Sequence, residues 1–567
     1  MFSKTYRICF AAAMLLIMAA CAGGDVAGDS ADTVSVAIHA EFEKKTITSA
    51  GAASETFKPA RYCWAEGFDP QTNQIYFSGY LNSMGLGIAD VPKGINFKVR
   101  LIARFEAPGK NNYGDFQMRG SVKNGVLLPF YNDTEAFNDI PDWSVLSDEY
   151  LANRDLSIKI RALDSTPDRE AGAFNIAYQA IEFASKMALL EPSLGLPNLH
   201  PFWSSDNQHT DYPRAAHNKQ NRVLAQSTGR TIFQHRIAGA GSAQTSVCAD
   251  EYNDSALMES FAHLLFADYS FPPVNPGRHY DSIIRRDCEE AAWIPRQTAS
   301  DSTVAFVSGF CDFISAAFRN SPFLTDVAPE NINTYNLSAP TAFPKARGGE
   351  FYRLSVAAAL YKIWTNALGG SQKGLQTMWD ATFKLGIANN LSDAAYPHGY
   401  LQCPVGNISS YLSGFANGAH FGVTPEMWGS ILAVLDGEAM GNPNADYFNQ
   451  GVFWKKINSF PAVETGTIKT YPNADGLFWN INQAVCYKFT QERAGSRKIT
   501  LELTGGQDLF LELFDAQGIV DESAHYNHKL TNREFKHSEL KPGNYVVRVR
   551  AGHTTQDKPA GFRLTIE

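Results

Sequence analysis

The chain has 567 residues, of which 44% are hydrophobic, 12% aromatic and 19% charged. At roughly 150 residues per domain this length predicts about three or four globular domains, and the composition excludes a disordered chain and a polytopic membrane protein. The 49 Lys and Arg residues and 58 Asp and Glu residues give a formal net charge of −9. Such a chain has no basic field to concentrate nucleic acid, so we expect no nucleic-acid partner.

Residues 1–20 have the features of an export signal, because a short basic segment precedes an apolar run that is too short to span a bilayer. The sequence MAAC at residues 18–21 resembles the bacterial lipobox. This resemblance implies a lipoprotein whose Cys21 carries acyl chains, with a membrane as partner, in the bacterial cell envelope at the outer membrane or cell surface. Simple cleavage before Cys21 is the alternative. The small and polar residues 21–32 predict a flexible tether.

Six cysteines remain after the signal and Cys21 are set aside, and export to an oxidising compartment favours disulfides. The chain has no C-x-x-C motif, which excludes thioredoxin-like chemistry and cysteine-based zinc ribbons. The pairing stays open, and several buried free thiols are the alternative. The disulfide candidates are Cys63, Cys248, Cys288, Cys311, Cys403 and Cys486.

Residues 33–165 alternate between apolar and polar side chains, for example at residues 34–38 and 97–103, with turn residues between the runs. This pattern predicts a β-sandwich. Three short motifs resemble the carboxypeptidase-regulatory-like immunoglobulin-type modules of secreted bacterial proteins, which implies an immunoglobulin-like β domain. These motifs are KPARYCWAE at 58–66, DPQTN at 69–73 and VPKG at 91–94.

Residues 168–460 change to a helical period. Within residues 173–190, apolar side chains recur at spacings of three and four, which places them on one face of a helix. Similar stripes occur at residues 255–266, 304–318 and 351–368. The pattern predicts a mainly α-helical domain.

Residues 463–567 return to short alternating runs, which predict a second β-sandwich. The strands are expected at residues 498–503, 509–514, 545–550 and 562–566. The motifs FDAQG at 514–518 and LKPGNY at 540–545 resemble the bacterial pre-peptidase C-terminal domain, which implies a jelly-roll-like sandwich of the kind fused to secreted peptidases and to other secreted proteins. We expect the first proteolytic cuts in residues 22–32 and around residues 460–466.

Two segments of the helical region resemble the zinc site of thermolysin-like, gluzincin-type peptidases. The sequence TIFQHRIAG at 231–239 resembles the H-E-x-x-H helix, and SALMESFAH at 255–263 resembles the helix of the third ligand. The resemblance implies His235 and Glu259 as zinc ligands. Arg236 occupies the place of the general base, Gly239 the place of the second histidine and His263 the place of an acid. Further resemblance at 172–176 and 349–364 extends the match over about residues 170–458.

The chemistry of these replacements argues against catalysis. A permanently cationic Arg236 cannot act as a general base and would repel Zn²⁺. We therefore expect no catalytic residue and no cofactor. Zinc is expected only if Glu259 and His263, which share a helical face, join His235 in a three-ligand set. The region around His200 is polar and is expected to face solvent.

Together these patterns predict a multidomain α+β protein with an N-terminal β-sandwich, a mainly α-helical metallopeptidase-like middle domain and a C-terminal β-sandwich. The expected function is binding, adhesion or scaffolding at the cell surface by a lipoprotein with an inactive metallopeptidase-like domain, with a protein, peptide or glycan as ligand. Two alternatives stay open. One is an active zinc endopeptidase with an atypical ligand set, and the other is a glycan-binding surface protein.

Overall fold

A computed structural model gives the fold, a mixed α+β structure with several sheets and, in the described residues, six α-helices. Within these residues no helix combines the length and the apolar character needed to cross a membrane. The structure describes residues 32–48, 51–111, 114–124, 141–163, 170–190, 196, 198–204, 232–238, 250–268, 302–328, 331–339, 352–388, 411–412, 424–438, 455–468, 470–471, 481–482, 484–504, 509–515, 518–522, 532–551 and 560–567.

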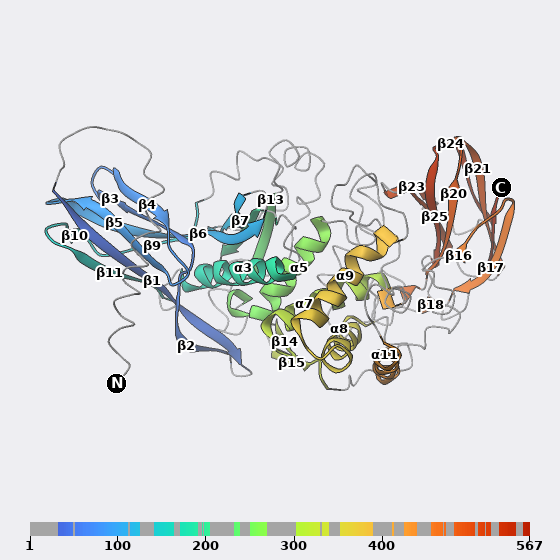
Figure 1. Ribbon diagram of the computed structural model, residues 1–567, viewed down its shortest axis with the longest axis horizontal. Coiled ribbons are helices and arrows are strands. Elements are labelled where there is room, and N and C mark those ends of the chain that lie inside the picture. Colours follow the sequence, from blue (N-terminus) through green and yellow to red (C-terminus); the bar gives the residue numbers. More distant parts are fainter. Residues whose placement is uncertain are drawn as a thin grey trace.

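The first sheet is built around strand β1 (Thr33–Thr48), coloured blue in Figure 1. One edge of β1 pairs in parallel with β11 (Leu156–Ala162). The other edge pairs antiparallel with β5 (Leu86–Pro92) and then with β2 (Gly51–Pro59). The strand expected at residues 34–38 is confirmed. Its alternate side chains are buried, as the period of two requires, namely Val34, Val36, Ile38, Ala40 and Phe42.

A nine-stranded sheet packs its apolar face into the same core. Its long strand β6 buries alternate residues, Phe97, Val99, Leu101, Ala103 and Phe105, which confirms the strand expected at residues 97–103. The strands are β3 (Cys63–Phe68), β4 (Ile75–Tyr80), β6 (Asn96–Asn111), β7 (Gly114–Ser121), β8 (Lys123–Asn124), β9 (Ser144–Leu146), β10 (Tyr150–Leu151), β12 (Asn198–Ser204) and β13 (Ile232–Ala238).

Strands β12 and β13 lie in the middle region, residues 168–460, where a mainly α-helical domain was expected. They pair in parallel, with Pro201 opposite His235, and they extend the nine-stranded sheet. The resemblance at residues 231–239 implied a helix, so that implication is wrong for the backbone of His235. The physical reason is composition, because β-branched and aromatic residues such as Ile232, Phe233 and Ile237 favour a pleated surface over a helix.

Helix α3 packs on this sheet, against β6, β7 and β12, and α5 packs on α3 (Figure 1). All the apolar positions that predicted the helix within residues 173–190 are buried in α3, which confirms that stripe. The stripes at 255–266, 304–318 and 351–368 are confirmed as α5, α7 and α8, the last continuing into a π-helical turn, η5 (Ile363–Ala367). The helices are α3 (Glu170–Leu190), α5 (Asp254–Asp268), α7 (Ser302–Arg319), α8 (Arg353–Lys362), α9 (Gln372–Ala388) and α11 (Pro425–Gly437).

Two smaller elements complete this part of the chain. A short 3-10 helix, η2 (Asp250–Tyr252), leads into α5. An antiparallel hairpin of β14 (Phe323–Ala328) and β15 (Asn331–Asn336) follows α7 and contacts α5.

The sandwich and the helices share one hydrophobic core. Helix α3 packs on β6, and the ring of its Phe183 lies 5.9 Å from that of Phe261 on α5 and 5.6 Å from that of Phe318 on α7, measured between centroids. A polar link crosses the same boundary. The ammonium of Lys44 on β1 donates to Asn175 on α3 at 3.1 Å and to Asp254 on α5 at 2.6 Å. The β layer and the helical layer are therefore continuous.

The C-terminal part forms a second β-sandwich with its own core, coloured orange to red in Figure 1. A five-stranded sheet in the order β16-β20-β25-β22-β23 faces a four-stranded sheet in the order β17-β26-β21-β24. The four strands predicted here are confirmed as β21, β22, β25 and β26. Residues 462–466, part of the segment around residues 460–466 where early proteolysis is expected, lie in β17, which pairs with β26 along its length.

The bounds of the C-terminal strands are β16 (Lys455–Lys456), β17 (Ala462–Ile468), β18 (Thr470–Tyr471), β19 (Ile481–Asn482), β20 (Ala484–Gln491), β21 (Gly495–Leu503), β22 (Leu509–Asp515), β23 (Gly518–Glu522), β24 (Asn532–Leu540), β25 (Gly543–Ala551) and β26 (Ala560–Ile566). The short strands β18 and β19 pair with each other. The inward-facing residues of both sheets, among them Leu501, Leu511, Val549 and Leu564, are fully buried.

Candidate functional site

Three helices bring a set of polar side chains into the helical layer. Helix α5 supplies Glu259 and His263, α7 supplies Cys311 and Asp312, and α8 supplies Arg353. Glu259 and His263 lie on one face of α5 because residues four apart are neighbours on a helix. The side chains of Asp312, His263 and Arg353 are at most 4% exposed, and that of Glu259 is 11% exposed.

A glycine allows the approach that builds this cluster. A Cβ atom on Gly309 of α7 would lie 2.7 Å from the carbonyl oxygen of Arg353 and 2.7 Å from Cβ of Val356 on α8. No larger residue fits at this crossing without moving one helix. Asp312, one turn after Gly309, is thereby held beside the guanidinium of Arg353.

Arg353 lies between two carboxylates. Its Nε donates to Oδ2 of Asp312 at 2.6 Å and its Nη2 donates to Oδ1 of the same side chain at 2.9 Å. Its Nη2 also forms an ion pair with Oε1 of Glu259. Burial alone lowers the pKa of Arg353, but the carboxylates of Asp312 and Glu259 outweigh burial and raise that pKa above its ordinary value. The guanidinium is therefore permanently charged and binds both acids.

The structure places the predicted metal ligands as follows. Nε2 of His263 lies 3.5 Å from Oε1 of Glu259. The backbone of His235 lies on β13, and its side chain is outside the described part of the chain. The described residues contain no group of three or more His, Cys, Asp or Glu side chains that could hold a metal ion. The three-ligand set with His235 therefore stays a prediction.

Sequence reasoning missed Arg353, although the segment that contains it was singled out. The signal was available in YRLSVAAAL at residues 352–360, where one arginine interrupts an otherwise apolar run. A charged residue inside a helix that is buried on all sides needs a partner of opposite charge. Two acids on neighbouring helices, Asp312 and Glu259, meet this requirement.

The cysteines depart from the disulfide expectation where the structure describes them. Cys63 and Cys311 are both buried free thiols, so the expectation of disulfides is wrong for these two. Each lies inside the packed core. Burial raises the pKa of Cys63 to about 12, and burial together with Glu259 raises the pKa of Cys311 well above its ordinary value, so both thiols are protonated and unreactive.

The other cysteines cannot be placed in the same way. Cys486 lies on β20, with its side chain outside the described part of the chain. Cys21, Cys248, Cys288 and Cys403 also lie outside the described residues. Lipidation of Cys21 and disulfides among the others stay predictions.

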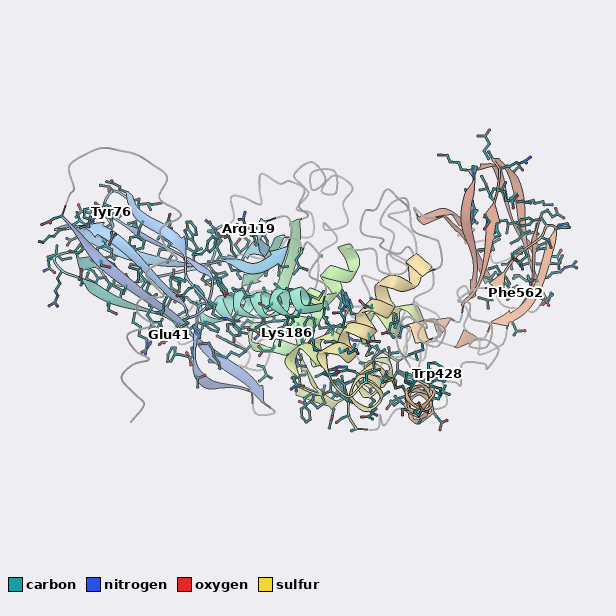
Figure 2. All side chains as sticks on the ribbon, viewed as in Figure 1. Glu41, Tyr76, Arg119, Lys186, Trp428 and Phe562 are labelled. Carbon is teal, nitrogen blue, oxygen red and sulfur yellow. The ribbon has the colours of Figure 1, made fainter. Side chains whose placement is uncertain are left out.

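A second polar cluster lies where β7, β8 and β12 meet. Oγ of Ser121 lies 3.1 Å from Nδ1 of His200, and Nζ of Lys123 lies 2.7 Å from Oδ1 of Asp142. Arg104 donates to Oδ2 of Asp142 at 2.8 Å. On the strand pair β6–β7, Arg119, labelled in Figure 2, forms a further ion pair with Glu106 at 2.7 Å.

This cluster corrects the expectation that His200 faces solvent in a loop. His200 lies on β12, where it is half-buried and its neighbours Leu199 and Trp203 pack into the core. Burial, with a smaller effect of Lys123, lowers the pKa of His200 to about 4, so its imidazole is neutral near neutral pH. Ser121 is only 3% exposed. A substrate cannot reach this hydroxyl, and the Ser121–His200 hydrogen bond is structural.

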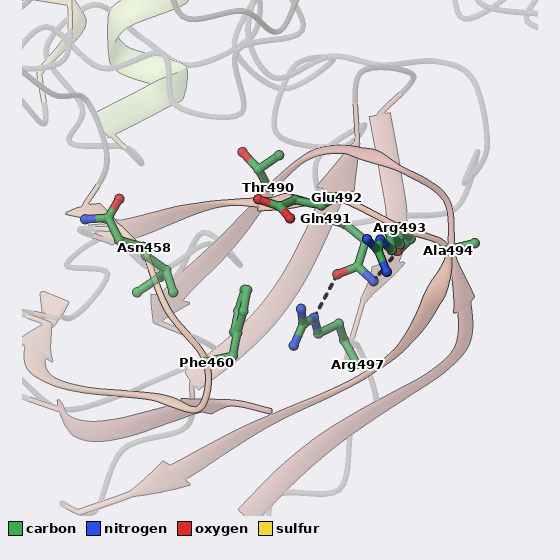
Figure 3. Close-up of a pocket in the computed structure, with 9 residues that line it drawn as sticks. Asn458, Phe460, Thr490, Gln491, Glu492, Arg493, Ala494 and Arg497 are labelled. Carbon is green, nitrogen blue, oxygen red and sulfur yellow. Dashed lines mark hydrogen bonds between the residues drawn. The ribbon is translucent and has the colours of Figure 1, made fainter.

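The C-terminal sandwich contains an open cavity of about 710 Å³. It lies between the segment that follows β16 and the turn that joins β20 to β21 (Figure 3). The lining is mainly polar and carries charges of both signs. The lining residues are Ile457, Asn458, Phe460, Thr490, Gln491, Glu492, Arg493, Ala494 and Arg497.

Comparisons with known proteins give low similarity. No protein-family model matches the sequence, and no curated protein matches it. Among solved structures, the pre-peptidase C-terminal domain of a collagenase from Bacillus anthracis is 16% identical with a TM-score of 0.15, over 20% of this chain and 93% of that domain. A periplasmic inhibitor of g-type lysozyme from Aeromonas hydrophila is 9% identical with a TM-score of 0.14, over 20% of this chain and 93% of the inhibitor. At these TM-scores neither match carries an argument about function.

Proposed function

We propose that this chain is an exported, lipid-anchored protein of the bacterial cell envelope that binds a ligand at the surface and has no peptidase activity. The lipobox-like MAAC and the preceding apolar segment support export and an anchor on Cys21. Several acyl chains, at about 0.8 kcal/mol per buried CH₂, would hold such a protein on the membrane. The C-terminal sandwich is proposed to be a pre-peptidase C-terminal-like module, on the strength of FDAQG and LKPGNY in a β-sandwich.

The ion pair between Glu259 and Arg353 is the observation that carries the non-catalytic assignment. In a zinc peptidase, this glutamate would direct its oxygens at the metal and no cation would compete for them. Here a guanidinium occupies Oε1, and Asp312 fixes that guanidinium through two further hydrogen bonds. A divalent ion at Glu259 would have to displace a buried and permanently charged group.

The metal content and peptidase activity of the purified full-length chain test this assignment. We expect substoichiometric zinc and no peptide hydrolysis that a chelator inhibits. Glu259→Gln is the informative variant, since its amide oxygen can still accept from Arg353 while the anionic ligand is lost. One equivalent of zinc per chain, with hydrolysis abolished in Glu259→Gln, would overturn the assignment and establish the zinc endopeptidase alternative.

The anchor requires a separate test. Cells expressing the chain should incorporate labelled fatty acid into the wild-type protein, and Cys21→Ser should abolish this labelling. Cys63→Ser is the control, because Cys63 is a buried thiol on β3 that no lipid-transferring enzyme can reach. Continued labelling of the Cys21→Ser protein would refute the lipoprotein assignment.

A further inference from the structure

We propose that the cavity of the C-terminal sandwich binds the free C-terminal carboxylate of a peptide, with Arg497 as the residue that recognises it. This inference rests on the proposed binding function and names the ligand class. The cavity volume of about 710 Å³ lies within the usual range for ligand sites. Arg497, one of its lining residues, is held in a defined orientation by two neighbours.

The first neighbour is Gln491. Oε1 of Gln491 accepts from Nε of Arg497 at 2.8 Å, and Nε2 of Gln491 donates to the carbonyl oxygen of Arg493 at 2.7 Å. Gln491 is 5% exposed, so its amide is itself fixed. A buried amide thus links the guanidinium to the backbone of the turn that forms the cavity rim.

The second neighbour is Phe460. The guanidinium carbon of Arg497 lies 3.6 Å from the centroid of the Phe460 ring, and Figure 3 shows the guanidinium directed toward that ring. The ring in turn packs edge to face against Phe489 at 5.6 Å between centroids. Stacking of this kind fixes the plane of an arginine, so little rotamer entropy is lost when a ligand binds.

In this orientation the guanidinium of Arg497 keeps its Nη1 and Nη2 edge for a ligand. Within the part of the chain that the structure describes, Arg497 uses Nε for its hydrogen bond, and its Nη1 and Nη2 atoms donate to no described residue. Two parallel N–H groups in one plane match the two oxygens of a carboxylate. Among the described lining residues, the charges of Arg493, Arg497 and Glu492 sum to +1. This balance suits a monoanion better than a phosphate dianion.

The covered ring distinguishes a peptide from an acidic sugar. Sugar-binding sites commonly use an open aromatic face, but Arg497 covers a face of Phe460 and Phe489 packs against it. The remaining lining presents Asn458 and Thr490, whose amide and hydroxyl groups suit the polar backbone of a peptide. The cavity therefore favours a peptide C-terminus over a uronic acid.

The test compares two probes on the purified full-length chain by isothermal titration calorimetry. N-acetyl-tetra-alanine with a free carboxylate should bind, and its C-terminal amide should bind about tenfold more weakly or not at all, as expected for a lost charge-assisted hydrogen-bond pair. Arg497→Gln should weaken binding of the free acid by about tenfold. Arg497→Lys keeps the positive charge but lacks the planar guanidinium. Its affinity for the free acid should therefore lie between those of the wild type and of Arg497→Gln.

Arg563→Gln is the matched control, since Arg563 is a half-exposed arginine on β26 of the same sandwich and does not line the cavity. It should leave binding unchanged. No binding of the free acid, or equal binding of acid and amide, would overturn the proposal. Binding of tri-galacturonic acid instead, dependent on Arg497, would reassign the site to acidic glycans. Neither the zinc assay nor the fatty-acid labelling involves this cavity, so failure here is distinguishable from failure of the proposed function.

Discussion

Arg353 neutralises two acids inside the helical layer, and this makes it the residue on which the cluster depends. Asp312 is fully buried and Glu259 nearly so. Removing one member of a buried ion pair is strongly destabilising because it leaves an uncompensated charge away from water. The buried acids Asp312 and Glu259 are therefore stable in the fold only while the guanidinium of Arg353 is present.

Arg353→Leu should therefore lower the free energy of unfolding by about 3–5 kcal/mol. Arg353→Lys keeps the charge but loses the bidentate contact with Asp312, so its loss should be smaller. Urea denaturation followed by the far-UV circular dichroism of the helices measures both variants. If Arg353→Leu unfolded at the wild-type urea concentration, the ion pairs would contribute nothing to stability.

His200 predicts a pH dependence of stability in a narrow window. Its pKa is about 4 in the folded chain and 6.5 in the absence of perturbation, so between these values the unfolded chain binds more protons. Stability should therefore decrease as the pH falls from about 6.5 to about 4, and His200 should have no effect above that window. The charged groups nearest the ring are Lys123, Asp142 and Arg104.

His200→Gln isolates this effect, because glutamine does not titrate and can still bond Ser121. The variant should lose less thermal stability than the wild type between about pH 6.5 and about pH 4.5. Thermal unfolding at several pH values, with both proteins in the same buffers, gives the comparison. If the melting temperatures of the two proteins decreased equally as the pH falls, His200 would not be the cause of the pH dependence of stability.

The sequence predicted which side chains lie close together where their spacing along one helix decides it. Glu259 and His263 are four apart in a helical stripe, so their proximity follows from helix geometry alone. The contacts of Arg353 with Asp312 and Glu259 do not follow in this way, since they join residues 41 and more positions apart through the crossing of three helices. The cavity at Arg497 likewise depends on a turn and a preceding segment that come together only in the folded sandwich.

At the scale of elements, period predicted four helices, α3, α5, α7 and α8, and four C-terminal strands, β21, β22, β25 and β26, whereas α9 and α11 were not predicted. Period failed at β12 and β13. A short apolar run can belong to a strand or to a buried helix, and period alone does not separate the two. The segment at residues 231–239 could likewise be read as a helix or as a strand. Its parallel pairing with β12 makes it a strand.

The crossing of α7 and α8 gives a prediction with an internal control. Gly309→Ala places a methyl group 2.7 Å from backbone and side-chain atoms of α8, so the helices must separate and stability should fall by about 1–3 kcal/mol. Gly429→Ala, on α11, where an added Cβ meets no described residue within 4 Å, should be neutral or should stabilise by about 0.5–1 kcal/mol. Urea denaturation of both variants gives the comparison, and equal effects would show that the close approach at Gly309 is not limiting.

At the scale of the whole molecule, the described residues form two large hydrophobic cores. The first joins the N-terminal sheets to the helices, with residues from Val34 to Leu435, and the second belongs to the C-terminal sandwich, from Ile457 to Ile566. Lys44 adds a polar link inside the first part. Because elements that share a core unfold together, the N-terminal sheets and the helices should behave as one cooperative unit and the C-terminal sandwich as another.

Calorimetric unfolding of the full-length chain should therefore show two transitions, each responding to a core substitution in its own part. Leu511 and Leu101 are both fully buried, the first in the C-terminal sandwich and the second on β6. Truncating a buried leucine to alanine removes about 2–5 kcal/mol. For a unit of about 100 residues, Leu511→Ala should lower the midpoint of one transition by about 8 °C or more. Leu101→Ala should lower the other midpoint and leave the first unchanged. A single transition that moves with both substitutions would mean that the two cores unfold as one unit.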